Sequence, residues 1–84
     1  MHRVFLERKA EKDLDGLPGH IREAAIKAIV NLEHNPRPAG SKKLKSEIRN
    51  WRLRISDYRI LYEIDDRSKT VLIYRIKHRK EAYR

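Results

Sequence analysis

Residues 51–64 read Trp51-Arg52-Leu53-Arg54-Ile55-Ser56-Asp57-Tyr58-Arg59-Ile60-Leu61-Tyr62-Glu63-Ile64. Over most of this stretch large apolar side chains alternate with charged ones. A period of two is that of a β-strand, whose successive side chains point to opposite sides. Ser56 and Asp57 are turn-forming residues near the middle of the stretch. The stretch therefore predicts a β-hairpin with one apolar face to bury and one face that carries fixed positive charge.

Two more strands are predicted outside the hairpin. Asp65-Asp66-Arg67-Ser68-Lys69 is a polar turn sequence, and the segment from Thr70 to about Lys77 reads as a last strand. Near the N-terminus, Val4-Phe5-Leu6 reads as a short first strand. The short connections between the last three strands favour an antiparallel meander.

Two helices are predicted between the first strand and the hairpin. Helical spacing predicts a short helix that ends near Asp15-Gly16 and buries Ala10, Leu14 and Leu17. The second helix covers residues 21–32, with Pro18 in its first turn. Its apolar stripe comprises Ile21, Ala25, Ala28, Ile29 and Leu32, widened by Ile26 and Val30. Because prolines break helices, residues 35–50 read as a connection.

The predicted fold is α+β, in the order strand, helix, helix, strand, strand, strand. One antiparallel β-sheet packed against the two N-terminal helices is the economical way to bury the stripe of the second helix. Residues 1–84 make a single domain, because a chain of 84 residues has room for only one small core.

Positive charge is concentrated in the second half of the chain. Residues 41–84 hold fourteen of the 21 Lys and Arg residues but only six of the twelve acidic ones, and the whole chain has a formal net charge of +9. A localised basic field is typical of proteins that bind a polyanion. Nucleic acid is therefore favoured as the partner over a surface that merely keeps the protein dissolved.

Other classes of function are disfavoured by what the sequence lacks. There is no cysteine, so disulfides and thiolate metal sites are excluded, and the four histidines are too scattered to predict a metal or cofactor. No apolar stretch has membrane-spanning length and no signal-peptide pattern opens the chain, which predicts a cytoplasmic protein without a membrane partner. A basic helix at a membrane surface is a weaker alternative, because most of the charge falls on strand-like sequence.

The cationic side chains suit metal-free cleavage of RNA. In that reaction a 2′-OH attacks the adjacent phosphate in line with the leaving 5′-oxygen, so a catalyst must align the strand, stabilise the phosphorane-like charge and move protons. Arginine suits the second task because its planar fork binds two phosphate oxygens and stays charged. Arg54, Arg59 and Arg79 converge if the hairpin and the last strand are neighbours. The alternative is that they are solvated residues on strand faces.

Two residues near the C-terminus are candidates for proton transfer and for alignment of the RNA strand. Histidine titrates near neutrality, so His78 is a candidate general base; the alternative is a structural residue at the end of the last strand. Alternation points it away from Arg79 unless the strand ends there. Tyr83 combines a ring that can stack on a base with a hydroxyl that can approach a phosphate, and the alternative is a frayed surface side chain.

Other aromatic and basic residues have simpler interpretations. Trp51 shares the apolar side of the hairpin with Leu53 and Ile55, so core packing is favoured over base stacking, and the same holds for Tyr58 and Tyr62. The lysines before the hairpin predict phosphate contacts that give affinity without reading sequence, and they are Lys42, Lys43 and Lys45.

Three motifs give the chain a family resemblance. They are Lys42-Lys43-Leu44-Lys45, then Trp51-Arg52-Leu53-Arg54…Asp57-Tyr58-Arg59…Tyr62-Glu63, and finally His78-Arg79-Lys80-Glu81-Ala82-Tyr83. In this order, after two helices and in a chain of this length, they resemble the RelE/ParE-superfamily toxins of type II toxin–antitoxin pairs. The resemblance implies the RelE-like microdomain. For the RelE branch it also implies a metal-independent endoribonuclease that cuts mRNA in the ribosomal A site.

The resemblance also implies roles for particular residues. Toxins of the RelE type use basic residues on the strand after the helices, where Arg52 and Arg54 lie, and an arginine at the start of the next strand, which Arg59 matches. They use a basic residue and a tyrosine near the C-terminus, which Arg79 and Tyr83 match. The best-known members carry lysines where this chain has arginines. That difference preserves charge stabilisation but not an equal capacity for proton transfer.

The implied partners are a cognate acidic antitoxin, in a toxin–antitoxin hetero-oligomer, and the ribosome with its mRNA. Two other functions stay open at this point. One is a ParE-like toxin that inhibits DNA gyrase without cutting nucleic acid. The other is an RNA- or ribosome-binding module without catalysis.

Overall fold

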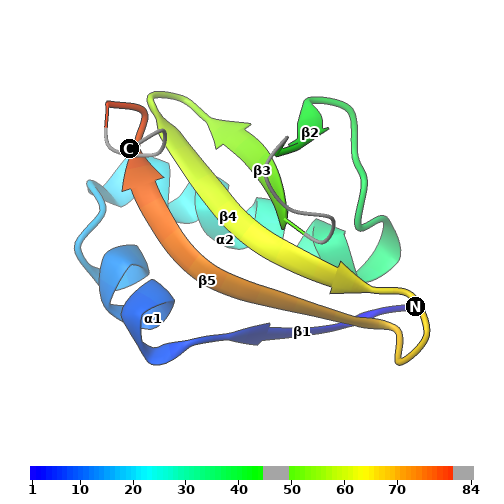
Figure 1. Ribbon diagram of the computed structural model, residues 1–84. Helices are drawn as coiled ribbons and strands as arrows, with labels where there is room; N and C mark the ends of the chain where they lie inside the picture. Colours follow the sequence, from blue (N-terminus) through cyan, green and yellow to red (C-terminus); the bar gives the residue numbers. More distant parts are fainter. Residues whose placement is uncertain (45–49, 81–84) are drawn as a thin grey trace.

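The computed structural model describes residues 1–44 and 50–80 of the chain. Within these ranges the elements are β1 (Arg3–Leu6), α1 (Arg8–Asp15), α2 (Gly19–His34), β2 (Ser41–Lys43), β3 (Asn50–Ile55), β4 (Tyr58–Asp65) and β5 (Thr70–His78). The predicted hairpin is confirmed as β3 and β4, with Ser56 and Asp57 as its two-residue turn. The predicted first and last strands are β1 and β5. Figure 1 shows the strands in one curved sheet, with α2 behind it and α1 beside β5.

The sheet is mixed rather than purely antiparallel. Its strand order is β1-β5-β4-β3-β2, and the four strands from β2 to β5 form an antiparallel meander. β1 instead pairs in parallel with β5, from Arg3 opposite Thr70 to Leu6 opposite Ile73. The antiparallel prediction is wrong for β1 because short turns fix the direction only of the strands that they join. β1 leads into the helices, so no turn constrains its direction relative to β5.

β2 is a strand that the sequence reading placed within a connection. Gly40, with a φ of 93°, precedes it, and Ser41, Lys42 and Lys43 pair with β3. Three polar residues carry no apolar alternation, so periodicity alone does not signal a strand here. Lysines on a short edge strand are a common protection against pairing with other chains.

The helices agree closely with the predicted ones. α1 ends at Asp15, as expected, and α2 contains residues 21–32 but runs from Gly19 to His34. Pro18 lies just before α2 rather than within its first turn, with an extended ψ of 145°. None of the described helices is long and apolar enough to cross a membrane.

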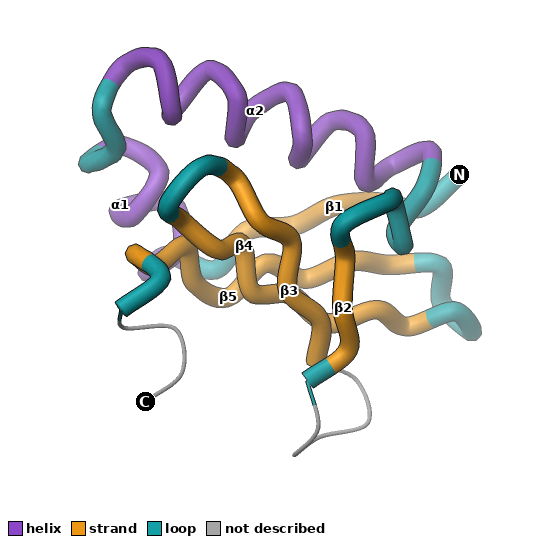
Figure 2. Tube along the Cα trace, turned by 90° about the horizontal axis from the view of Figure 1, so that it is seen from above, coloured by secondary structure: helices purple, strands orange, loops and turns teal. Residues whose placement is uncertain are grey.

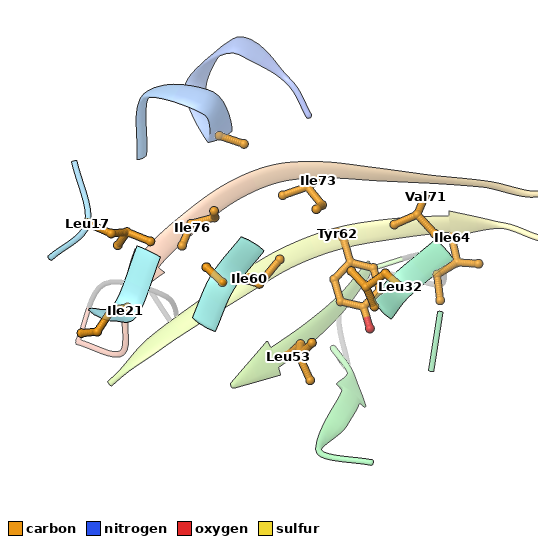
Figure 3. Close-up of a cluster of buried hydrophobic side chains, with 12 residues drawn as sticks. Leu17, Ile21, Leu32, Leu53, Ile60, Tyr62, Ile64, Val71, Ile73 and Ile76 are labelled. Carbon is orange, nitrogen blue, oxygen red and sulfur yellow. The ribbon is translucent and has the colours of Figure 1, made fainter. Parts of the chain in front are cut away.

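The core lies between the helices and one face of the sheet (Figure 3). Alternate residues of the strands point into it, so the apolar half of the period-two pattern is buried. Its members are Ala10, Leu17, Ile21, Ala25, Leu32, Leu53, Ile60, Tyr62, Ile64, Val71, Ile73 and Ile76. Leu14, Ala28 and Ile29 pack against it half-buried. Ile26 and Val30 do not widen the buried stripe; they are 38% and 51% exposed, because α2 meets the sheet along one side only.

The other face of the sheet is covered by no described helix. Figure 2 shows α2 crossing one side of the strands, and Figure 1 shows the opposite side turned toward the viewer. The polar half of the alternating pattern points to this side. We call it the open face, and its strand residues are assigned from the register with their buried neighbours.

Candidate nucleic-acid interface

Three cations stand in register across the open face. Arg54 on β3 pairs with Arg59 on β4, and Arg59 pairs with Lys77 on β5. Paired residues of neighbouring antiparallel strands project from the same face with their Cβ atoms about 5 Å apart. We call these three residues the cationic row. Lys77 was not among the predicted site residues, and only the pairing of β4 with β5 reveals it.

Two further cations adjoin the cationic row. Arg52 is two residues before Arg54 on β3 and therefore shares its face, and Lys42 on β2 pairs with Arg52. Lys43 pairs with Trp51, which packs on the core, so it belongs to the other side of the sheet. Lys45 lies outside the described residues. The lysine cluster is thus not one surface: among its described members, Lys42 is the one that joins the arginines.

The Arg59 guanidinium responds to the charges around it. Partial burial is the largest cause that lowers the pKa of Arg59, and like charges lower it further, those of Arg54, Arg52 and Arg79. Asp57 acts in the opposite direction. The side chain still carries its charge at any physiological pH. The three neighbouring guanidinium groups thus disfavour the charge on Arg59, and a bound anion would offset this.

Backbone contacts hold the arginines at the hairpin turn. Arg54 donates from Nε to the Ser56 carbonyl at 3.1 Å, and Arg59 donates from one terminal nitrogen to the Tyr58 carbonyl at 3.2 Å. Each bond uses one N–H of a group that has five. Both forks therefore keep donors for an anion while their positions are fixed by the main chain.

Arg79 is brought to the same end of the sheet. β5 ends at His78, and the Arg79 N–H donates to the Asp57 carbonyl at 2.7 Å. This bond ties the segment after β5 to the turn between β3 and β4. Because β5 ends at His78, Arg79 no longer follows the alternation of the strand. His78 and Arg79 therefore need not point to opposite sides of the sheet.

His78 lies on the helix-facing side of the sheet, away from the cationic row. It pairs with Tyr58, which packs on the core, and the two rings meet edge to face with centroids 5.3 Å apart. The Lys80 N–H donates to Nδ1 of His78 at 3.3 Å. This bond occupies Nδ1 with a main-chain donor of the segment after β5. The structure does not bring His78 together with the arginines.

The remaining predicted residues divide between the core and the undescribed segments. Tyr83 lies outside the described residues. Trp51 is half-buried and packs on the core, as expected, with the Arg37 guanidinium 5.1 Å from its ring centroid. Tyr62 is fully buried and donates to the Pro36 carbonyl at 2.9 Å. Its burial raises the pKa of Tyr62 to about 12, so its hydroxyl stays protonated and structural.

A carboxylate on α1 supports the strand that carries Lys77. β1 pairs with β5 only as far as Ile73, and beyond that point α1 lies against β5. Asp13 of α1 accepts a bond from the Ile76 N–H at 2.9 Å and two from the Arg75 guanidinium, at 2.8 and 3.2 Å. The carboxylate therefore replaces the missing strand partner and fixes the backbone next to Lys77.

The site as a whole suits binding of a polyanion. Within residues 1–44 and 50–80, no group of three or more His, Cys, Asp or Glu side chains gathers as a metal site would need. The cations occupy the end of the open face near the hairpin turn. Such a cluster, on a sheet face that no described helix covers, is suited to contacts with a phosphate backbone.

Comparison with known proteins gives the family. Residues 4–83 match the family described as the ParE toxin of the type II toxin–antitoxin system parDE. Toxin RelG of Mycobacterium tuberculosis is 39% identical over 85 residues, with 99% of this chain and 97% of RelG covered. Toxin RelE3 of Methanocaldococcus jannaschii is 33% identical, with 96% and 94% covered. The chain belongs to the RelE/ParE superfamily of type II toxins.

Solved structures agree with this assignment. The archaeal RelE–RelB complex from Pyrococcus horikoshii matches with a TM-score of 0.84 and 27% identity, over 96% of this chain and 98% of that one. The RelBE2 toxin–antitoxin complex from Mycobacterium tuberculosis matches with a TM-score of 0.79 and 33% identity, over 92% and 96%. The predicted superfamily and its α+β fold are confirmed.

Proposed function

We propose that this toxin is a RelE-type endoribonuclease that cuts mRNA on the ribosome and thereby stops translation. The observation that carries the proposal is the cationic row, extended by Arg52 and Arg79, on the uncovered face of the sheet. The curated relatives named RelE3 and RelE support the same branch of the superfamily.

The reaction needs correctly placed charge and two proton transfers. The 2′-hydroxyl gives its proton to solvent water as its oxygen attacks the neighbouring phosphorus, the bond from phosphorus to the 5′-oxygen breaks, and the leaving oxygen takes up a proton. The products are a 2′,3′-cyclic phosphate and a 5′-hydroxyl. The forks of Arg54 and Arg59 are placed to bind the equatorial oxygens, where charge develops. Arg79 neutralises the same charge from beyond the end of β5. No metal ion enters this scheme.

Lys77 is the candidate proton donor of the cationic row. The leaving 5′-oxygen needs a proton, and guanidinium groups hold theirs too strongly to supply it. Lys77 pairs with Arg59, so its ammonium group is near the phosphate that the arginines would bind. His78 faces the other side of the sheet. Tyr83, which lies outside the described residues, stays a candidate for base stacking or for contact with the reacting phosphate.

The ribosome would supply the alignment that so small a surface lacks. In-line attack requires the 2′-oxygen, the phosphorus and the 5′-oxygen to be held in line, and positioning of this kind is worth several kcal/mol of barrier. Lys42 and Arg52 extend the basic surface and would hold flanking phosphates, as would Lys43 and Lys45 if they reach the same RNA. The protein would act in the cytoplasm, held inactive by an acidic antitoxin that covers the open face.

Controlled expression tests the proposal. Induction should arrest growth, with new 5′ ends appearing in translated mRNA while the same RNA without ribosomes stays intact. The Arg59→Ala variant, expressed at the same level, should give neither effect. Efficient cutting of free RNA would contradict the ribosome-dependent mechanism. Intact mRNA together with damaged DNA would instead identify a gyrase inhibitor, and arrest without either lesion would identify a binding module.

A further inference from the structure

An aromatic side chain stands on the open face far from the cationic row. Phe5 on β1 pairs with Leu72, and Leu72 pairs with Glu63 on the open face, whereas Val4 and Leu6 pack on the core. The Phe5 ring is 47% exposed. Exposing this much of a phenyl ring forgoes part of its transfer free energy.

One cation lies against this ring. Arg3, two residues earlier on the same face of β1, places its guanidinium carbon 5.6 Å from the Phe5 ring centroid. An open hollow of about 320 Å³ adjoins the ring, and it is lined by Met1, His2, Arg3, Val4, Phe5 and Glu33. The cation beside the ring makes this end of the open face suited to a group that is both planar and anionic.

A nucleotide of single-stranded RNA has both properties. Sheet surfaces that bind unpaired RNA commonly stack bases on exposed aromatic side chains while arginines contact the backbone. The exposed ring favours RNA over an acidic protein segment here, because a base offers a flat face for stacking that acidic side chains lack, and the ring lies on the same face as Lys42, Arg52 and the cationic row. We propose that Phe5 and Arg3 form a base-stacking subsite for the RNA strand whose phosphate is bound at the cationic row. The proposal rests on the proposed function.

The distance along β5 sets the spacing between the two sites. Five residues separate Leu72, beside Phe5, from Lys77 in the cationic row, which is roughly 16 Å of strand at about 3.3 Å per residue. Stacked nucleotides rise about 3.4 Å each, so about five nucleotides of a stacked strand separate the subsite from the cleaved phosphate. A three-nucleotide RNA bound at the arginines should therefore not reach Phe5, while a ten-nucleotide RNA should.

Binding of RNA oligonucleotides of two lengths tests the subsite. Purified toxin is titrated into fluorescently labelled three- and ten-nucleotide single strands, and anisotropy gives the two dissociation constants. Phe5→Leu, which keeps the apolar bulk but removes the π face, should weaken binding of the ten-nucleotide RNA about tenfold and leave the three-nucleotide RNA unchanged. Phe5→Trp should bind both RNAs at least as well as the wild type. Thermal unfolding checks that the variants are folded, as expected for a half-exposed site.

The outcomes separate this proposal from the one on which it rests. If Arg59→Ala weakens both RNAs and Phe5→Leu weakens neither, the subsite is wrong and the proposed function stands. If neither variant changes binding of either RNA, the subsite is wrong, and cleavage of ribosome-bound mRNA by Arg59→Ala then decides the proposed function separately. If Phe5→Leu leaves RNA binding intact but weakens co-purification with the antitoxin, the ring belongs to a protein interface and the subsite is overturned.

Discussion

The two faces of the sheet use the same strands for opposite purposes. On the helix-facing side Ile60, Tyr62, Val71 and Ile73 are completely buried, and each contributes to the free energy of folding. On the open face the same strands present the cationic row, in which the charge of Arg59 is disfavoured by burial and by Arg54 and other nearby arginines. One face therefore stabilises the fold, while the other carries a repulsion that a bound polyanion would relieve. Substitutions on the two faces should act on different measurements.

The largest effect on stability is expected on the helix-facing side of the sheet. Tyr62→Ala removes a fully buried ring and leaves the Pro36 carbonyl without its donor, so the free energy of unfolding should fall by about 3–5 kcal/mol. Urea denaturation measures this loss. Tyr62→Phe is the matched control, since it keeps the ring and should cost only about 1 kcal/mol. A Tyr62→Ala protein as stable as the wild type would contradict the placement of the ring in the core.

Arg59→Ala should have the opposite effect: a large loss of activity with little change in the free energy of unfolding. Removing a preorganised phosphate-binding cation should cost about 3 kcal/mol of transition-state stabilisation, a loss of more than a hundredfold in the cleavage rate on ribosomes. The free energy of unfolding should stay within about 0.5 kcal/mol of the wild-type value, or rise slightly because a repulsion is removed. Arg67→Ala, an exposed arginine in the turn after β4, is the matched control. Normal cleavage by Arg59→Ala would show that the open face is not the active surface.

Lys77 and His78 are adjacent in sequence but lie on opposite sides of the sheet, so they give a direct comparison. Lys77→Met keeps the length of the side chain and removes its proton, and cleavage should slow about a hundredfold if Lys77 protonates the leaving oxygen. His78→Gln should change the rate much less, because that ring packs on Tyr58. Single-turnover cleavage of ribosome-bound mRNA measures both rates. The reverse result would restore His78 to the catalytic role that sequence alone suggested.

The difference between the two faces also shows which features the sequence predicts and which it does not. The alternation of residues 51–64 predicts the hairpin and its buried side, because period and hydrophobicity are local properties. It does not predict which strands adjoin, so the parallel pairing of β1 and the placement of Lys77 beside Arg59 were missed. The side of the sheet on which Lys43 and His78 lie likewise depends on register, with Trp51 and Tyr58 respectively, and local periodicity does not supply it.

The smallest effect is expected away from both faces, where Asp66 holds the segment after α2. Arg37 donates to the Asp66 carboxylate at 2.7 and 3.2 Å, and this interaction, with a smaller one from His2, holds the pKa of Asp66 below its ordinary value. A carboxylate with a lowered folded-state pKa stabilises the protein above its unfolded-state pKa, and the contribution disappears as pH falls through the folded-state pKa. Wild type should therefore be slightly more stable than Asp66→Asn at pH 7, with the difference vanishing in strong acid. Urea denaturation across this pH range measures it, with Asp15→Asn as the control for removing one exposed carboxylate. A difference that persists unchanged in acid would show that the asparagine disturbs packing rather than the ion pair.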